Sequence, residues 1–288
     1  MARNRDAAID DHNAILNSDS TRIYCDGSGI NSKIGAAAVL YKGLNLPKTL
    51  CYHLGSDKDH TVYEAEAVGI TLAAKLLLSE PNPRKLIHIL VDNQAAIKSS
   101  ERTKSKPGHY ILHKLCRIIR EACRKHNLKR NDIVISWVPG HKGIQGNGRG
   151  DEEARKAAES PLQNSATKRL PLYLRTTPLP SSLPALKRAH RELSKERWKR
   201  AWERSPQFQS AKKFNMLSPS NSFVKLTALL PKKHIAMIIW LRTNHISLNL
   251  HLHRIRKADT PLCPHCKTTE NVRHFLNNCP HYARARHI

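Results

Sequence analysis

Three acidic residues stand where apolar segments end, so side chains from different elements can meet there. Asp26 and Asp92 each follow a strand-like segment, and Asp151 begins a helical pattern. Each residue has an ordinary structural alternative: Asp26 in a turn, Asp92 before a short helix and Asp151 as a helix N-cap. Carboxylates gathered at one end of a sheet repel one another, however, and proteins tolerate them chiefly when a cation holds them. Together, the three residues predict a cation site.

A fourth carboxylate comes from residues 62–79, which have the apolar spacing of a helix. Glu64 and Glu66 are two positions apart, so only one of them can face a sheet. Glu66 shares its face with apolar residues such as Ile70, whereas Glu64 shares a face with Lys75. We therefore expect Glu66 to point toward the other carboxylates and Glu64 to point into solvent.

A second group of metal-binding residue types lies near the C-terminus. Cys263 and Cys266 are followed by His274 and Cys279, eight and five residues further on. Four such ligands suit tetrahedral Zn²⁺ and leave no open position for catalysis. The spacing predicts a structural zinc site, and a small helical pair with buried thiols is the alternative. Two further histidines that lie close enough in sequence to replace a ligand are His265 and His281.

The elements that would position the four acids alternate in the first half of the chain. Strand-like segments lie at 21–25, 35–41, 49–54, 86–91 and 133–137, and helical patterns lie at 62–79, 110–126 and 151–159. Three strands followed by alternating helices and strands predict an α/β fold with a mixed sheet and helices packed on it.

The second half of the chain is more basic and mostly helical in pattern. Residues 1–150 carry 23 Lys and Arg against 14 Asp and Glu, whereas residues 168–258 carry 20 against 3. Five prolines between residues 161 and 184 interrupt any long helix, so we expect a linker there. The best helical patterns beyond it are 183–204 and 225–253.

Four segments of the first half carry the candidate acids. Their sequences are Ile23-Tyr-Cys-Asp-Gly-Ser, Thr61-Val-Tyr-Glu-Ala-Glu-Ala, Leu90-Val-Asp-Asn-Gln-Ala-Ala and Trp137-Val-Pro-Gly-His-Lys-Gly-Ile-Gln-Gly-Asn-Gly-Arg-Gly-Asp. In order and spacing they resemble the motifs of type 1 ribonuclease H, over about residues 20 to 160. The resemblance implies a five-stranded mixed sheet with flanking helices. It also implies the metal ligands Asp26, Glu66, Asp92 and Asp151 and the loop histidine His141. Gly148 and Gly150 stand where the family commonly has Glu and Ala.

The same resemblance implies an endoribonuclease that hydrolyses the RNA strand of RNA·DNA hybrids. Two Mg²⁺ ions, or Mn²⁺ in their place, would stabilise charge on the attacking water, the phosphoryl oxygens and the leaving 3′ oxygen. His141 would assist proton transfer and product release. The 2′-hydroxyls of one strand would identify the substrate. The alternative is a catalytically inactive remnant that still binds nucleic acid.

Segments of the second half show another resemblance. Leu241-Arg-Thr-Asn-His, Leu262-Cys-Pro-His-Cys and His274-Phe-Leu-Asn-Asn-Cys-Pro-His-Tyr resemble the tail that follows the ribonuclease H domain in LINE-like non-LTR retrotransposon polyproteins, where Gly is commoner at the Asn244 position. This resemblance implies a derivative of such an element, with a reverse transcriptase expected upstream. The predicted organisation is a disordered segment over 1–19, a catalytic domain over 20–160, a linker over 161–184, a basic helical region over 185–258 and a zinc-binding tail over 259–288.

The composition favours a polyanionic partner. The 288 residues include 49 Lys and Arg against 23 Asp and Glu, a net charge of +26, and nucleic acid is a usual partner for such charge. Basic residues surround Trp198 and Trp202 within 186–204, which suits phosphate contacts and base stacking, including on single strands. A solvated amphipathic helix with its tryptophans in a small core is the alternative.

We expect an intracellular protein, nuclear or cytoplasmic. The chain has no secretory signal and no apolar stretch of membrane-helix length, so we expect no membrane partner. Seven cysteines, three of them beside histidines, fit metal ligation and reduced thiols rather than a disulfide framework. We expect no small-molecule cofactor.

Overall fold

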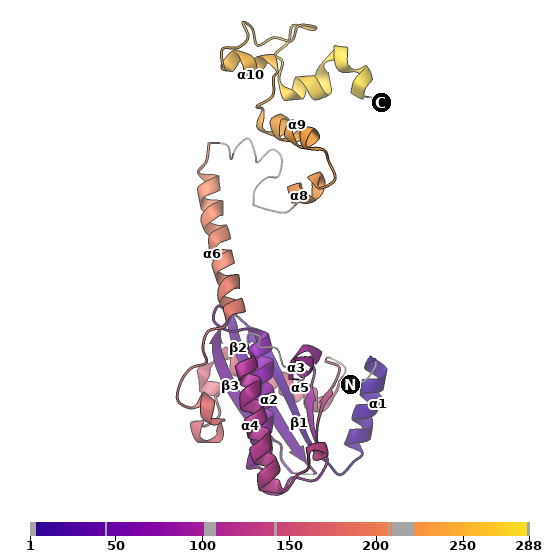
Figure 1. Ribbon diagram of the computed structural model, residues 1–288, viewed down its shortest axis with the longest axis vertical. Coiled ribbons are helices and arrows are strands. Elements are labelled where there is room, and N and C mark those ends of the chain that lie inside the picture. The colour runs from indigo at the N-terminus through magenta and orange to yellow at the C-terminus, as the bar shows by residue number, and fades with distance from the viewer. Residues whose placement is uncertain are drawn as a thin grey trace. The chain divides into compact units, whose positions relative to one another are not determined.

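The computed structural model describes residues 4–43, 45–100, 108–140, 143–206, 208 and 222–286 (Figure 1). It divides into two compact units, Met1–Arg191 and Glu192–Ile288, and each is described by itself. The first unit holds the sheet, and the second holds short helices and the Cys/His cluster. No helix within the described ranges is long and apolar enough to cross a membrane.

The first unit is built on one five-stranded sheet, which confirms the predicted fold class. Its strands are β1 (Thr21–Ile30), β2 (Lys33–Lys42), β3 (Lys48–Ser56), β4 (Ile87–Val91) and β5 (Ile133–Trp137). Their order is β3-β2-β1-β4-β5. β1, β2 and β3 pair antiparallel, whereas β4 runs parallel to both β1 and β5. The sheet is therefore mixed.

β1 is longer than predicted, because it pairs with β2 in a hairpin that continues past the end of β4. Asn31 and Ser32 both have positive φ, as a two-residue hairpin turn of the primed type requires. The pairing places Ile30 opposite Lys33. Asp26 consequently lies inside a strand, which excludes the turn that was its structural alternative.

Helices cover both faces of this sheet. They are α1 (Arg5–Leu16), α2 (Val62–Ser79), α3 (Gln94–Ser100), α4 (His109–His126) and α5 (Gln145–Glu159), with the short 3-10 helix η1 (Arg130–Asp132). α2 has the predicted bounds. α5 begins six residues before the predicted start, so Asp151 lies within a helix rather than at its N-cap.

Two glycines allow α2 and α5 to approach the sheet closely from opposite sides. A Cβ at Gly27 of β1 would lie 2.4 Å from the backbone nitrogen of Glu66 in α2. A Cβ at Gly35 of β2 would lie 2.2 Å from the backbone nitrogen of Ala158 in α5. Any side chain at either position would push a helix away from the sheet, so the spacing of the layers depends on these two residues.

The disorder predicted for residues 1–19 is wrong for Arg5–Leu16, because α1 forms there and packs on the sheet. Its N-cap, Asn4, accepts a hydrogen bond from the backbone N–H of Ala7 at 2.8 Å. His12 is buried, and its Nε2 lies 2.8 Å from the hydroxyl of Tyr24 on β1. Ala8 and His12 are one turn apart, so they form the face that the helix buries.

The linker predicted for residues 161–184 is also wrong, because this segment packs against the sheet domain. It contains the 3-10 helices η2 (Pro161–Gln163), η3 (Thr167–Arg169) and η4 (Leu172–Leu174). The backbone N–H of Ser165 donates to the carbonyl of Cys51 at 3.0 Å, and the side chain of Asn164 accepts from the N–H of His53. Both acceptor and donor on the sheet side belong to β3, so the segment covers an edge strand.

The same segment completes the apolar core. Leu170, Leu174 and Leu179 are buried in the main hydrophobic cluster of the sheet domain. The hydroxyl of Tyr173 lies 2.6 Å from Oγ1 of Thr71 in α2. The prolines prevent a long helix, as predicted, but they do not prevent packing. The compact unit therefore runs to Arg191 rather than ending near residue 160.

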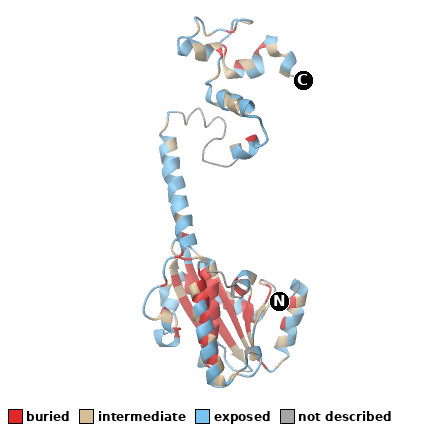
Figure 2. Cartoon of the chain, viewed as in Figure 1, coloured by how far each residue is buried: buried red, intermediate tan, exposed pale blue. Residues whose placement is uncertain are grey.

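The second unit is mostly exposed (Figure 2). α6 (Leu183–Glu203) has nearly the predicted bounds and reaches into this unit, and Ala185 is its buried residue. The helix predicted over 225–253 is instead three: α8 (Ser222–Thr227), α9 (Lys232–Thr243) and α10 (Asn249–Arg254). Pro231 caps the start of α9, and Asn244 ends it in the left-handed conformation. The short helices η5 (His274–Asn278), η6 (Pro280–Tyr282) and η7 (Arg284–Arg286) follow.

Truncation tests the boundary of the sheet domain. We expect residues 1–191 to fold cooperatively and residues 1–159 to be less stable by more than about 4 kcal/mol, because each buried leucine that is lost contributes roughly 1.5–3 kcal/mol. Urea unfolding of the two truncated proteins measures the difference. Equal stability would show that residues 160–191 are a linker after all.

Single substitutions provide the control for this truncation. Leu174→Ala should lower the free energy of unfolding by about 2–5 kcal/mol, because Leu174 is buried in the core. Leu172→Ala should change it by less than about 0.5 kcal/mol, because Leu172 is 63% exposed.

Candidate active site

Parallel pairing of β1 with β4 brings two of the predicted acids together. Cys25 lies opposite Val91 in this ladder, so the next residues along the two strands are Asp26 and Asp92. β4 ends at Val91, which leaves the Asp92 side chain at the edge of the sheet. The indole Nε1 of Trp137 donates to the backbone carbonyl of Asp92 at 2.9 Å and holds that edge in place.

Glu66 reaches the same point from α2. The close approach of α2 at Gly27 sets its position. Asn93 donates a hydrogen bond from Nδ2 to Oε1 of Glu66 at 3.4 Å. The other carboxylate oxygen, Oε2, is buried and has no hydrogen-bond partner among the described residues. A buried oxygen of this kind can accept a cation.

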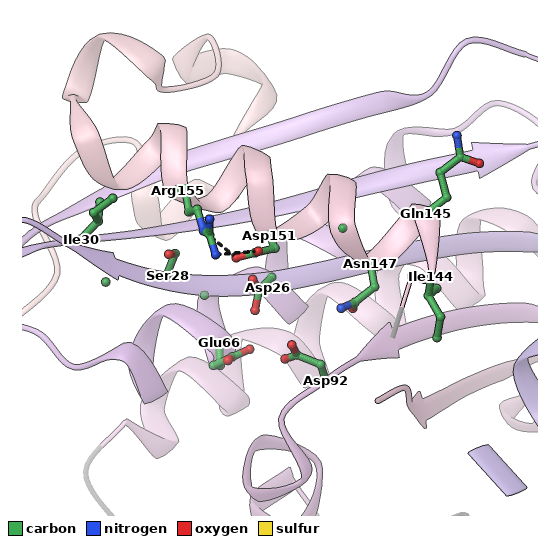
Figure 3. Close-up of a pocket in the computed structure, with 14 residues that line it drawn as sticks. Asp26, Ser28, Ile30, Glu66, Asp92, Ile144, Gln145, Asn147, Asp151 and Arg155 are labelled. Atoms are coloured by element: carbon green, nitrogen blue, oxygen red, sulfur yellow. Dashed lines mark hydrogen bonds and ion pairs between the residues drawn. The ribbon is translucent and has the colours of Figure 1, made fainter. Parts of the chain in front are cut away.

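The three side chains converge on one pocket (Figure 3). Ligand oxygens of Asp26, Glu66 and Asp92 all lie within 4.8 Å of one another. The pocket has a volume of about 600 Å³, and Asp151 and Arg155 also line it. Carboxylate oxygens at this spacing are the donor set that a hard divalent cation prefers. The residues therefore fit a metal ion.

The pKa values of the clustered carboxylates also favour a cation at this site. Burial, and then the neighbouring charge of Asp92, raises the pKa of Asp26 to about 7. Burial, followed by the charges of Asp26 and Asp92, raises the pKa of Glu66 to about 9. In both cases the ionised carboxylate is disfavoured because it is desolvated and close to like charges. A bound cation would reverse this balance.

Asp151, the fourth predicted ligand, lies beside this cluster. It projects from α5 next to Asp26, and its charge contributes to the raised pKa of Asp26. Both of its oxygens, however, accept from the guanidinium of Arg155: Nε to Oδ1 at 3.1 Å and Nη2 to Oδ2 at 3.1 Å. Within the described residues, Asp151 is not among the acids whose oxygens lie within 4.8 Å of one another.

Glu64 differs from its prediction. It is 2% exposed rather than in solvent, because it forms a capping box with Thr61. The Thr61 hydroxyl accepts from the backbone N–H of Glu64, and the Glu64 carboxylate accepts from the backbone N–H of Thr61 at 2.9 Å. Glu64 therefore caps the start of α2, and Glu66 alone of the pair joins the acid cluster, as predicted.

The last motif is only partly described. His141 lies outside the described residues. Gly148 and Gly150 lie within α5 rather than in a loop. A Cβ at Gly148 would meet no atom within 4 Å, and one at Gly150 would lie 3.8 Å from the Tyr24 Cβ. Space therefore does not explain why glycine occupies these positions.

Two residues of the pocket were missed by the sequence analysis. Arg155 and Asn147 lie four residues after and before Asp151 on α5, so all three line one side of the pocket. The Asn147 side chain is buried, and its Oδ1 has no hydrogen-bond partner in the described part of the chain. The i, i+4 spacing from Asp151 is the signal that could have identified both residues.

The four C-terminal residues predicted to bind zinc also come together. Ligand atoms of Cys263, Cys266, His274 and Cys279 all lie within 4.8 Å of one another. Sγ of Cys263 and Sγ of Cys279 are 3.9 Å apart, and Sγ of Cys266 is 3.2 Å from Nε2 of His274. This donor set and spacing fit a tetrahedral metal ion.

Local hydrogen bonds support this cluster. The Cys263 N–H donates to the Thr268 carbonyl at 2.7 Å, which closes the loop between the first two ligands. Oγ1 of Thr268 lies 3.1 Å from Nδ1 of His274 and so orients the imidazole. His265 and His281 stack on each other, with ring centroids 3.5 Å apart, and are not part of the ligand set.

A comparison with known protein families identifies the family of the sheet domain. The family model described as RNase H matches residues 18–159. This part of the chain is therefore an RNase H domain, in agreement with the order and spacing of the four motifs. That family generally uses Mg²⁺.

Solved structures with similarity to the chain include proteins of this kind. The prototype foamy virus protease–reverse transcriptase is 23% identical, with a TM-score of 0.37, and the match covers 49% of this chain and 21% of the viral one. RNase H1 from Halobacterium salinarum NRC-1 is 19% identical, with a TM-score of 0.36 and coverage of 48% and 97%. LC11-RNase H1, solved in complex with an RNA/DNA hybrid, is 16% identical, with a TM-score of 0.38 and coverage of 49% and 99%.

The raised pKa of Asp26 predicts a pH-dependent loss of stability in metal-free protein. A folded-state pKa above the unfolded one means that stability is complete below about pH 4 and is lost as the pH rises through about 7. Asp26→Asn should therefore raise the free energy of unfolding at pH 8 in EDTA, by roughly 4 kcal/mol. The gain should vanish near pH 4.

Thermal unfolding between pH 4 and pH 8 measures this gain. Asp10→Asn is the matched control, because Asp10 is an exposed acid outside the cluster. The same gain in Asp10→Asn, or no gain in Asp26→Asn at pH 8, would contradict the repulsion described above.

Proposed function

We propose that the RNase H domain of residues 18–159 is an active, Mg²⁺-dependent endoribonuclease that hydrolyses the RNA strand of RNA·DNA hybrids. The observation that carries the proposal is the convergence of the Asp26, Glu66 and Asp92 oxygens within 4.8 Å in one pocket. The family match to residues 18–159 and the net charge of +26 support a nucleic-acid substrate.

Each residue of the site has a distinct part in this chemistry. Divalent ions, when bound, stabilise charge on the attacking water, the phosphoryl oxygens and the leaving 3′ oxygen. Asp26 in β1 and Asp92 directly after β4 would supply ligand oxygens from neighbouring positions. Glu66 adds a ligand oxygen from α2. β1 and α2 carry Asp26 and Glu66, and Asp92 directly follows β4, which keeps the site preorganised.

The second unit supports a separate, structural proposal. We propose that Cys263, Cys266, His274 and Cys279 bind Zn²⁺ and that this ion stabilises the tail. Three thiolates and one imidazole complete a tetrahedral shell and leave no position for substrate. On the resemblance of the tail sequences, we also propose that the chain derives from a LINE-like retrotransposon polyprotein.

Replacement of single acids tests the enzymatic proposal. Glu66→Gln and Asp92→Asn should each lower the rate of hybrid cleavage more than about 100-fold, because each removes a charged metal ligand. Glu64→Gln is the matched control. A glutamine retains the capping-box acceptor, so its rate should stay within about threefold of the parent rate. Cleavage of a labelled hybrid, with Mg²⁺ and with EDTA, provides the measurement.

The outcomes separate the enzyme from an inactive remnant. A remnant would bind the hybrid in both conditions and cut it in neither. A larger loss of cleavage rate in Glu64→Gln than in Glu66→Gln would show that Glu64, and not Glu66, is the metal ligand.

Zinc removal tests the role of the tail. A zinc-selective chelator, or the double change Cys263→Ser and Cys266→Ser, should unfold the tail alone, because metal binding supplies most of the folding free energy of such a small site. Limited proteolysis should then cleave within residues 259–286 while the sheet domain stays intact. Cleavage of the hybrid, measured after Mg²⁺ is restored, should keep its maximal rate.

A further inference from the structure

Asp151 and Arg155 form an ion pair, and both residues line the pocket. Arg155 holds both oxygens of Asp151 in the two-point contact described above, and Figure 3 shows the pair beside Asp26. The two residues are four positions apart on α5, so the helix itself brings them together. The pair does not depend on any other element.

The pair brings a positive charge into a pocket whose other charged residues, among those described, are acids. Among the described residues that line it, Arg155 is the one cation, against the four carboxylates already named. Asp151 has both oxygens engaged by the guanidinium, so an ion that binds there must compete with Arg155 for them. The Arg155 side chain is 55% exposed and the Asp151 side chain 28% exposed, so the pair is accessible to solutes and open to exchange.

Exchange would leave a free guanidinium in the pocket. A planar guanidinium presents paired N–H donors that match two oxygens of a phosphate as well as they match a carboxylate. A nucleic-acid backbone that enters the pocket brings such oxygens. Phosphate binding to Arg155 and metal binding to Asp151 are therefore compatible, whereas the Arg155–Asp151 pair competes with both.

We propose that Arg155 is a positioning residue that exchanges between Asp151 and a phosphate of the substrate, and so couples metal binding at Asp151 to substrate binding. This inference rests on the proposed function, because it requires that the acids bind metal ions. By thermodynamic reciprocity, a substrate that draws Arg155 away from Asp151 strengthens metal binding there, and a bound ion strengthens the substrate contact.

Metal binding without nucleic acid provides the first test. Titration calorimetry with Mn²⁺ or Mg²⁺ measures the affinity of the ion that binds at Asp151, the weaker of the two ions. In Arg155→Gln this ion should bind roughly fivefold more tightly, because the guanidinium that competes for Asp151 is gone. Arg155→Lys should change the affinity less, because a lysine keeps the charge without the two-point contact.

Lys156→Gln is the matched control. Lys156 neighbours Arg155 and pairs with Glu152 at 2.7 Å on the same helix, but it does not line the pocket. Its replacement also removes one cation and one i, i+4 pair from α5, so it should shift metal affinity less than about twofold. Equal unfolding temperatures of the Arg155→Gln and Lys156→Gln variants would show that both remain folded.

Substrate binding provides the second test. At saturating Mg²⁺, Arg155→Gln should raise KM for the hybrid about tenfold, as expected for the loss of a charge-assisted phosphate contact, with a much smaller change in kcat. In EDTA the hybrid affinity should change less than about threefold, because Arg155 then remains paired with Asp151 and contributes less to binding.

The outcomes separate this inference from the function on which it rests. Equal metal affinity in the parent, Arg155→Gln and Lys156→Gln would overturn the inference while leaving the acid cluster as a metal site. An unchanged KM in Arg155→Gln would overturn the exchange with substrate. A parent protein that binds neither ion would overturn the inference and the proposed function together.

Discussion

Repulsion between buried carboxylates is the constraint on which the sheet domain depends. Asp26, Glu66 and Asp92 meet although burial and like charge raise the pKa values of Asp26 and Glu66. Such a cluster persists only when its scaffold is stiff. Parallel pairing of β1 with β4 places the two aspartates side by side, and the absence of a side chain at Gly27 lets α2 bring Glu66 to them.

α5 connects that cluster to the rest of the domain. One side of the helix packs on β2 at Gly35, and another presents Asp151 and Arg155 to the pocket. The segment after the helix then covers the edge of β3 and adds its leucines to the core. The site and the core therefore share one continuous stretch of chain, which runs past residue 160 into the apolar cluster of the sheet domain.

The second unit has a different basis for stability. Few apolar side chains are buried among the residues of this unit that the structure describes, and Cys263 and Cys279 are among the fully buried ones. A unit with so little apolar burial has too small a core to hold itself together, and metal ligation is the usual substitute. On the two proposals made above, metal ions would act in opposite ways. The fold of the first unit holds the acid cluster together, whereas Zn²⁺ would stabilise the fold of the second.

Local sequence patterns were sufficient to predict many features of this protein. The order and spacing of the acidic motifs, the bounds of α2 and the Cys/His spacing all came from the sequence, because each depends on residues near one another in the chain. The Thr61-x-x-Glu64 capping box was equally local but was overlooked. Tertiary structure alone decided that α1 packs through His12 on Tyr24 and that the proline-rich segment joins the core. These contacts join residues far apart in sequence, and their free energy comes from burial and pairing that no local pattern encodes.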